Sequence, residues 1–156
     1  MHNPARVSVI AAAVLTPALL FAAAASREYV LLDHSSTRAR LPFSDGVVVG
    51  NTLYVAGTIG SDPKTGQAPS DPEEEARLVM DSVQRTVEGA GFKMDDLVSV
   101  QVFCTDLALY DTFNKVYRSY FHEHFPARAL IGAAKLLRNG HYEVMGIAVK
   151  GSSGAP

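Results

Sequence analysis

The segment from Asp71 to Gly91 constrains the fold more than any other part of the chain, because it carries complete start and stop signals for a helix. Asp71 can cap the first turn, Pro72 suits the first helical position, and Glu74 stands at the capping-box position. Gly91 ends the pattern. The apolar residues between them recur at helical spacing: Ala76, Met80, Val83, Val87 and Ala90. The segment predicts an amphipathic helix whose apolar stripe lies against another apolar layer.

β-type patterns surround this helix. Residues 46–49 and 52–57 are β-rich runs that meet at Gly50-Asn51, which predicts a hairpin. Another alternating strand is expected at Val98, Val100, Val102 and Cys104, a second helix at residues 109–121, and further strands at 29–32, 129–134 and 142–149. This order predicts an α+β two-layer sandwich, with two helices on one face of the sheet. The other face carries apolar residues, so we expect oligomerisation to cover it.

The first 25 residues are not expected to belong to this domain. An uncharged apolar run at residues 7–25 follows a short basic start, and Ala23-Ala24-Ala25 forms a cleavage pattern before Ser26. The pattern predicts a signal peptide at residues 1–25, a domain at 26–150, a flexible tail at 151–156, and a secreted or periplasmic location. The alternative is an uncleaved membrane anchor, because the run approaches the roughly 20 residues that span a bilayer.

Composition and motifs exclude several function classes. With one Cys, the chain cannot form an internal disulfide or a thiolate metal site. A net charge of −2 without a basic cluster argues against a large nucleic-acid surface. His122 and His124 are two residues apart, which does not place them on one helical face, so metal binding has little support. Phosphate-loop and nucleophile-elbow motifs are also missing from the sequence.

Two charged residues stand out: Arg128 lies between a helix end and an apolar strand, and Glu143 lies inside an apolar β-type segment. Arg128 has the rigid fork of donors that holds a carboxylate by two parallel bonds, or it could pair with an acidic neighbour at a subunit contact. Glu143 either faces solvent or lies in a pocket, where desolvation would raise its pKa towards the range that suits proton transfer. Spacing does not decide between these alternatives.

The ordered set of segments from Leu41 to Lys150 resembles the Rid (RidA/YjgF) family of reactive intermediate deaminases. The segments that carry the resemblance are Leu41-Pro42-Phe43-Ser44, residues 49–57 (VGNTLYVAG), 62–66 (DPKTG), 88–91 (EGAG), 102–107 (VFCTDL), 114–117 (NKVY), 125–129 (FPARA) and 142–144 (YEV). They follow one another in uninterrupted order over nearly the whole expected domain.

The resemblance implies a chorismate-mutase-like fold, a homotrimer, and ligand sites in the clefts between subunits. Enzymes of the family hydrolyse 2-imino acids, or their enamine tautomers, to 2-oxo acids and ammonia without a metal or organic cofactor. By resemblance, Arg128 would hold the substrate carboxylate, and Glu143 would orient or deprotonate water and relay a proton to nitrogen. The backbone at Gly57 would line the pocket, and Asn114 corresponds to a pocket position.

Three of the expected ligand-contact positions are among those that depart from the family pattern. Phe43 stands where Tyr is usual, Thr58 ends a usual Ser-Gly-Gln that here is Ala-Gly-Thr, and Leu130 takes a place where deaminases often have Cys. All three are expected to contact ligand, so they leave the preferred substrate open. The alternatives to an exported deaminase are a non-catalytic trimer that binds small carboxylates and an endoribonuclease, which the acidic balance argues against.

Overall fold

The computed structural model describes residues 26–32 and 41–151, and over these residues it contains a six-stranded sheet with two α-helices. The strands are β1 (Arg27–Val30), β2 (Gly46–Val49), β3 (Thr52–Ile59), β4 (Leu97–Cys104), β5 (Ala127–Gly132) and β6 (Tyr142–Val149); the helices are α1 (Pro72–Gly89) and α2 (Tyr110–Tyr117). Short 3-10 turns occupy Met94–Asp96, Leu107–Leu109, Arg118–Tyr120 and Leu137–Asn139. The expected leader and most of the expected tail lie outside the described residues.

The sheet is mixed, with strand order β1-β2-β3-β6-β4-β5. All neighbouring pairs are antiparallel except β4 and β5, which are parallel. A parallel pair needs a long crossover, and α2 supplies it. The predicted hairpin is present as β2 and β3, with Gly50 at a φ of 62° in the turn. Since β6 lies between β3 and β4, the last two strands of the chain are not neighbours.

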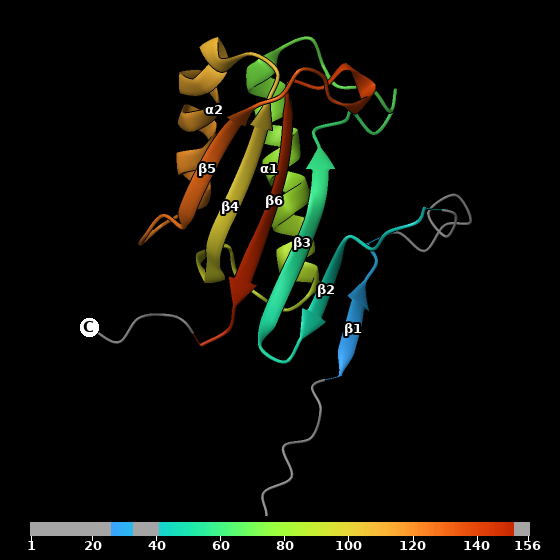
Figure 1. The fold of residues 1–156 in the computed structure, drawn as a ribbon, viewed down its shortest axis with the longest axis vertical. Coiled ribbons are helices and arrows are strands. Elements are labelled where there is room, and N and C mark those ends of the chain that lie inside the picture. The colour runs from blue at the N-terminus through green and yellow to red at the C-terminus, as the bar shows by residue number, and fades with distance from the viewer. Residues whose placement is uncertain (1–25, 33–40, 152–156) are drawn as a thin grey trace, which may run out of the picture.

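Both helices lie on one side of the sheet, so the predicted two-layer α+β arrangement is confirmed (Figure 1). The start of α1 is capped by Asp71, whose carboxylate accepts a 3.0 Å hydrogen bond from the Glu73 N–H. Glu74 is exposed and takes no part in that bond. The predicted apolar stripe of α1 faces the sheet, with Ala76, Met80, Val83 and Val87 fully buried.

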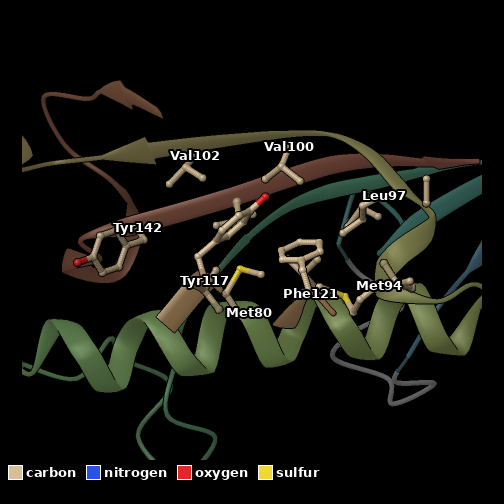
Figure 2. Close-up of a cluster of buried hydrophobic side chains, with 14 of the residues drawn as sticks. Met80, Met94, Leu97, Val100, Val102, Tyr117, Phe121 and Tyr142 are labelled. Atoms are coloured by element: carbon tan, nitrogen blue, oxygen red, sulfur yellow. The ribbon is translucent and has the colours of Figure 1, made fainter. Parts of the chain in front are cut away.

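The core fills the space between the helices and the sheet. Figure 2 shows Met80 of α1 and Tyr117 of α2 directed towards Val100 and Val102 of β4, with Tyr142 of β6 at one end. Cys104 is buried in the same layer, as expected for a small apolar residue, and burial raises the pKa of its thiol. Each fully buried large side chain contributes about 1.5–3 kcal/mol.

One detail of the predicted β4 pattern is wrong. Val98 is 39% exposed, while Leu97 is buried and joins the core. The cause is a register shift against β6 between Leu97 and Ser99, which reverses the alternation at the start of the strand.

The face of the sheet that points away from the helices is apolar and open in the single chain. Tyr29, Tyr54, Ile131 and Met145 lie on this face by strand register, and each is exposed by 38–61%. An exposed apolar surface of this kind marks a contact surface. None of the helices in the described part of the chain is long and apolar enough to cross a membrane.

Candidate functional site

Arg128 lies on the helix-facing side of β5 and reaches α2. It is registered with the buried Val100 of β4, so both side chains point into the same layer. The guanidinium lies 4.5 Å from the centre of the Tyr117 ring, and it donates a 2.6 Å hydrogen bond to the Asn114 side-chain oxygen. Arg128 and Asn114, each of which the resemblance assigns to the ligand pocket, are therefore in direct contact.

The groups around the Arg128 guanidinium are aromatic rings and the Asn114 amide, not a carboxylate. Phe113 and Tyr110 rings also lie within 6 Å of the guanidinium carbon, at 5.8 and 5.9 Å. Within residues 26–32 and 41–151, no Asp or Glu forms an ion pair with Arg128. Burial raises the pKa of the Tyr117 hydroxyl to about 12, although the Arg128 charge acts in the opposite direction. Tyr117 is therefore neutral near pH 7 and leaves the positive charge uncompensated.

A cavity of about 280 Å³ opens beside Arg128. Its walls are Tyr110, Asn114, Tyr117, Arg118, Phe125, Pro126 and Arg128, none of which is acidic. A partly buried guanidinium with free donors and no counterion is suited to bind an anion, and a planar carboxylate matches its fork. Such a guanidinium can bind a ligand carboxylate or an acidic side chain of another subunit, which are the two alternatives that the sequence leaves for Arg128.

Glu143 lies on the opposite face of the sheet, near the start of β6. It pairs with Ile59 of β3 and Phe103 of β4, and it follows the buried Tyr142. Gly57 lies next to its carboxylate, and a β-carbon at that position would overlap the carboxylate oxygen. The absence of a side chain at Gly57 therefore makes room for the Glu143 carboxylate.

Glu143 and Gly57 line a second cavity, of about 510 Å³. Phe43 and Thr58 line it too, so four of the predicted site residues come together here. The Thr58 hydroxyl is 3.1 Å from the Ser82 hydroxyl of α1, because a register shift between Val55 and Thr58 turns this end of β3 towards the helix. Leu130 lies elsewhere: it packs against the core on the same face as Arg128.

Sequence reasoning missed two residues around this second cavity. Arg138 lines it from a left-handed conformation with φ 57°, and its guanidinium donates to the Ser61 hydroxyl at 3.1 Å. Glu75 of α1 is fully buried and binds the chain just before Glu143. The sequence did contain a sign that Glu75 is buried, because Glu75 lies four residues before Val79 and therefore on the buried face of the helix. No sequence pattern indicated the left-handed conformation of Arg138.

The two cavities are separate within one chain. Arg128 and Glu143 project from opposite faces of the sheet, and β4 lies between their strands. Phe103 of β4 pairs with Glu143 on one side and with Ile131 on the other. Arg128 lies three residues before Ile131 in β5, so it is also displaced from Glu143 along the strands. In one chain, therefore, the Arg128 cavity and the Glu143 cavity do not meet. In the described part of the chain, His, Cys, Asp and Glu form no group of three or more that could hold a metal ion.

The sequence matches the family described as Endoribonuclease L-PSP over residues 34–150. It is 39% identical over 112 residues to 2-iminobutanoate/2-iminopropanoate deaminase of Escherichia coli K12, covering 70% of this chain and 88% of the relative. It is 36% identical over 111 residues to the deaminase of that name from Bos taurus, covering 70% and 81%.

Solved structures agree with this similarity. RidA from the Antarctic bacterium Psychrobacter sp. PAMC 21119 aligns with a TM-score of 0.66 at 32% identity, covering 70% of this chain and 89% of that one. E. coli TdcF, solved with bound serine, aligns with a TM-score of 0.67 at 33% identity and the same coverage. The match over most of the length in sequence and fold, together with the predicted chorismate-mutase-like architecture, shows that the chain belongs to the Endoribonuclease L-PSP family, which is the Rid/YjgF family.

Proposed function

We propose that the protein hydrolyses 2-imino acids, or their enamine tautomers, to 2-oxo acids and ammonia. The observation that carries this proposal is Arg128, a partly buried guanidinium beside a cavity whose walls hold no carboxylate. The names of the E. coli and Bos taurus relatives support the same reaction. The TdcF structure with bound serine supports a ligand that carries a carboxylate.

Arg128 would bind the substrate carboxylate. One of its N–H groups donates to the Asn114 oxygen, and its guanidinium carbon lies 4.5 Å from the centre of the Tyr117 ring. The remaining donors are free for two parallel bonds to a carboxylate. This arrangement fixes the imine carbon relative to the protein, and positioning of that kind supplies a large part of the rate enhancement.

Glu143 would activate the water. Its carboxylate accepts a proton from the water as the water oxygen bonds to the imine carbon, and it then returns a proton to nitrogen. The hydroxyl of the carbinolamine formed in this way then gives its proton, through Glu143, to the amino group as the remaining carbon–nitrogen bond breaks. Ammonia leaves and a carbonyl remains, so the balance is imine plus water to 2-oxo acid plus ammonia. The space beside Gly57 lets the Glu143 carboxylate reach into the second cavity.

A complete site needs two copies of the chain, because Arg128 and Glu143 face opposite sides of the sheet. A homotrimer would bring Arg128 of one copy to Glu143 of the next and would also cover the open apolar face. Tyr54, Ile131 and Met145 supply the apolar contacts for such an interface. The proposed ligand sites therefore lie in the clefts between subunits.

The N-terminal pattern adds a proposed location. Residues 1–25 would act as a signal peptide, leaving the domain of residues 26–150 and a short tail in the periplasm or outside the cell. N-terminal sequencing of protein recovered from the exported fraction tests this: a start at Ser26 supports cleavage. A chain that keeps Met1 and stays with membranes would instead be anchored.

The reaction is tested with protein purified from cells that express the full chain. An amino acid oxidase generates 2-imino acids in place, and the loss of semicarbazide-trappable imine is followed. We expect acceleration by the native protein and a loss of at least about 100-fold in the Arg128→Ala variant. Arg77→Ala, which removes an exposed arginine of α1 outside both cavities, is the matched control and retains activity.

Failure of the native protein with small, branched and aromatic imines would overturn the enzyme proposal. Binding of 2-oxo acids without turnover, lost in Arg128→Ala, would then favour a non-catalytic protein that binds small carboxylates. Calorimetry on the same preparations distinguishes these two outcomes.

A further inference from the structure

The Arg128 cavity contains a second guanidinium, from Arg118. Arg118 begins the 3-10 turn Arg118–Tyr120 that continues α2, and it lies four residues after Asn114. Residues four apart share a helical face, so Arg118 lies on the same face as Asn114, the residue that accepts the hydrogen bond from Arg128. Both arginines line the same cavity of about 280 Å³.

Neither arginine of this cavity has an acidic partner. Among the described residues, no carboxylate forms an ion pair with Arg118 or Arg128. Lys115 of the same helix provides the contrast, because its ammonium group lies 3.0 and 3.1 Å from the Glu73 carboxylate oxygens of α1. Lys115 is therefore compensated by a carboxylate of α1, whereas Arg118, which lines the cavity, is not.

Two like charges that share a cavity repel each other, and an anion between them removes this cost. The Asn114 bond and the Tyr117 ring hold Arg128 in place, while Arg118 is exposed and free to adjust. The rings of Tyr110 and Phe125 line the same cavity and give it apolar wall. The cavity therefore offers a fixed carboxylate site, an apolar stretch and a second, movable cation.

We propose that Arg118 makes the site selective for 2-imino acids with a second carboxylate, such as 2-iminosuccinate and 2-iminoglutarate. This inference rests on the proposed deaminase function and names the substrate class of that site. The carboxylate next to the imine carbon binds Arg128, the methylene groups lie against the aromatic walls, and the distal carboxylate binds Arg118. The hydrolysis itself is unchanged, with water consumed and ammonia released.

The test compares two imines generated in place: 2-iminosuccinate from D-aspartate by D-aspartate oxidase, and 2-iminopropanoate from D-alanine by D-amino acid oxidase. The native protein is expected to show a higher kcat/KM for 2-iminosuccinate. Arg118→Gln is expected to lower that value about tenfold, mainly through KM, while kcat/KM for 2-iminopropanoate stays within about twofold. Lys115→Gln removes the same charge from the same helix outside the cavity and leaves both values unchanged.

Equal effects of Arg118→Gln on both substrates, or no effect on either, would overturn the inference while the deaminase proposal stands. A loss of oligomeric mass in Arg118→Gln with an unchanged substrate ratio would overturn it too, and would assign Arg118 to a contact between copies. Calorimetry with oxaloacetate and pyruvate measures binding alone, so it tests the second subsite independently of turnover. Tighter binding of oxaloacetate that is lost in Arg118→Gln supports the second subsite even where turnover fails, and equal binding of the two acids contradicts it.

Discussion

Glu75 shows how a single residue can fix the chain segment that leads to Glu143 in the candidate site. Its carboxylate is fully buried and accepts hydrogen bonds from the backbone N–H groups of His141 and Tyr142, at 2.7 and 2.9 Å. The His141 ring nitrogen lies 2.6 Å from its other oxygen. A buried carboxylate is tolerated only where donors replace the lost water. These contacts tie α1 to the start of β6, immediately before Glu143.

Replacing Glu75 by Ala is expected to destabilise the fold by about 3 kcal/mol, because two buried backbone N–H groups lose their acceptor. Glu75→Gln should cost less, since the amide oxygen still accepts. Urea unfolding monitored by circular dichroism measures both. Glu74→Ala, one position earlier and exposed, is the control and should change stability by less than about 0.5 kcal/mol. Equal losses of stability in Glu74→Ala and Glu75→Ala would contradict the prediction, because the buried hydrogen bonds of Glu75 would then add nothing to the free energy of unfolding.

The sequence singles out residues whose chemistry is unusual for their setting. Arg128 and Glu143 stand out because each is a charged residue beside or inside an apolar strand pattern. Their surroundings were not predictable, because the ring of Tyr117 and the gap at Gly57 come from other elements. Glu75 was missed because a glutamate in the first turn of a helix ordinarily faces solvent and interacts with the helix dipole.

At the scale of elements, local signals defined the helices and strands but not their pairing. The cap and stripe of α1 and the β2–β3 hairpin follow from short-range patterns. The parallel pairing of β4 with β5 and the insertion of β6 between β3 and β4 depend on contacts far apart in the chain. Periodicity carries no information about such neighbours. The shift that exposes Val98 likewise arises between two strands and leaves no mark in either one alone.

The contact between β3 and β6 yields a prediction about Gly57. Gly57→Ala places a methyl group where the Glu143 carboxylate now lies, so the carboxylate must move. Because the Glu143 side chain is flexible, we expect a small change in stability but a loss of kcat on the order of 10–100-fold. Steady-state kinetics and thermal unfolding on one preparation separate the two effects.

The matched control for this variant is Gly66→Asn. Gly66 has a positive φ of 69° with open space around it, and Asn tolerates that conformation. It should leave kcat unchanged. Undiminished kcat in Gly57→Ala would mean that Glu143 does not act from the position it holds beside Gly57.

At the scale of the whole molecule, the arrangement of the sheet decides what one chain can do alone. The helices cover one face, and the other face exposes Tyr54, Ile131 and Met145. Arg128 lies on the covered face and Glu143 on the open face, so under the proposed function association would both bury apolar surface and bring the two residues together. Formation of the complete ligand site would then depend on assembly of the oligomer.

This coupling predicts complementation between two inactive variants. Arg128→Ala keeps Glu143, and Glu143→Gln keeps Arg128. When both are expressed together and mix at random in a trimer, each site receives an intact arginine and an intact glutamate from different copies with a probability of about a quarter. Mixed protein should therefore recover about a quarter of native activity, whereas each variant alone stays inactive. Activity per site and oligomeric mass are measured together.

The control mixture joins Arg128→Ala with the double variant Arg128→Ala/Glu143→Gln, which assembles in the same way but contains no intact arginine. It should remain inactive at every ratio. If the first mixture shows no more activity than its separate components although mixed trimers form, both groups must act within one chain. The opposite faces that they occupy in the single chain would then have to be brought together by a rearrangement of the sheet, which a packed core resists because interiors are dense and transmit strain. Recovery in the first mixture and none in the control would place each reaction site between two copies of the chain.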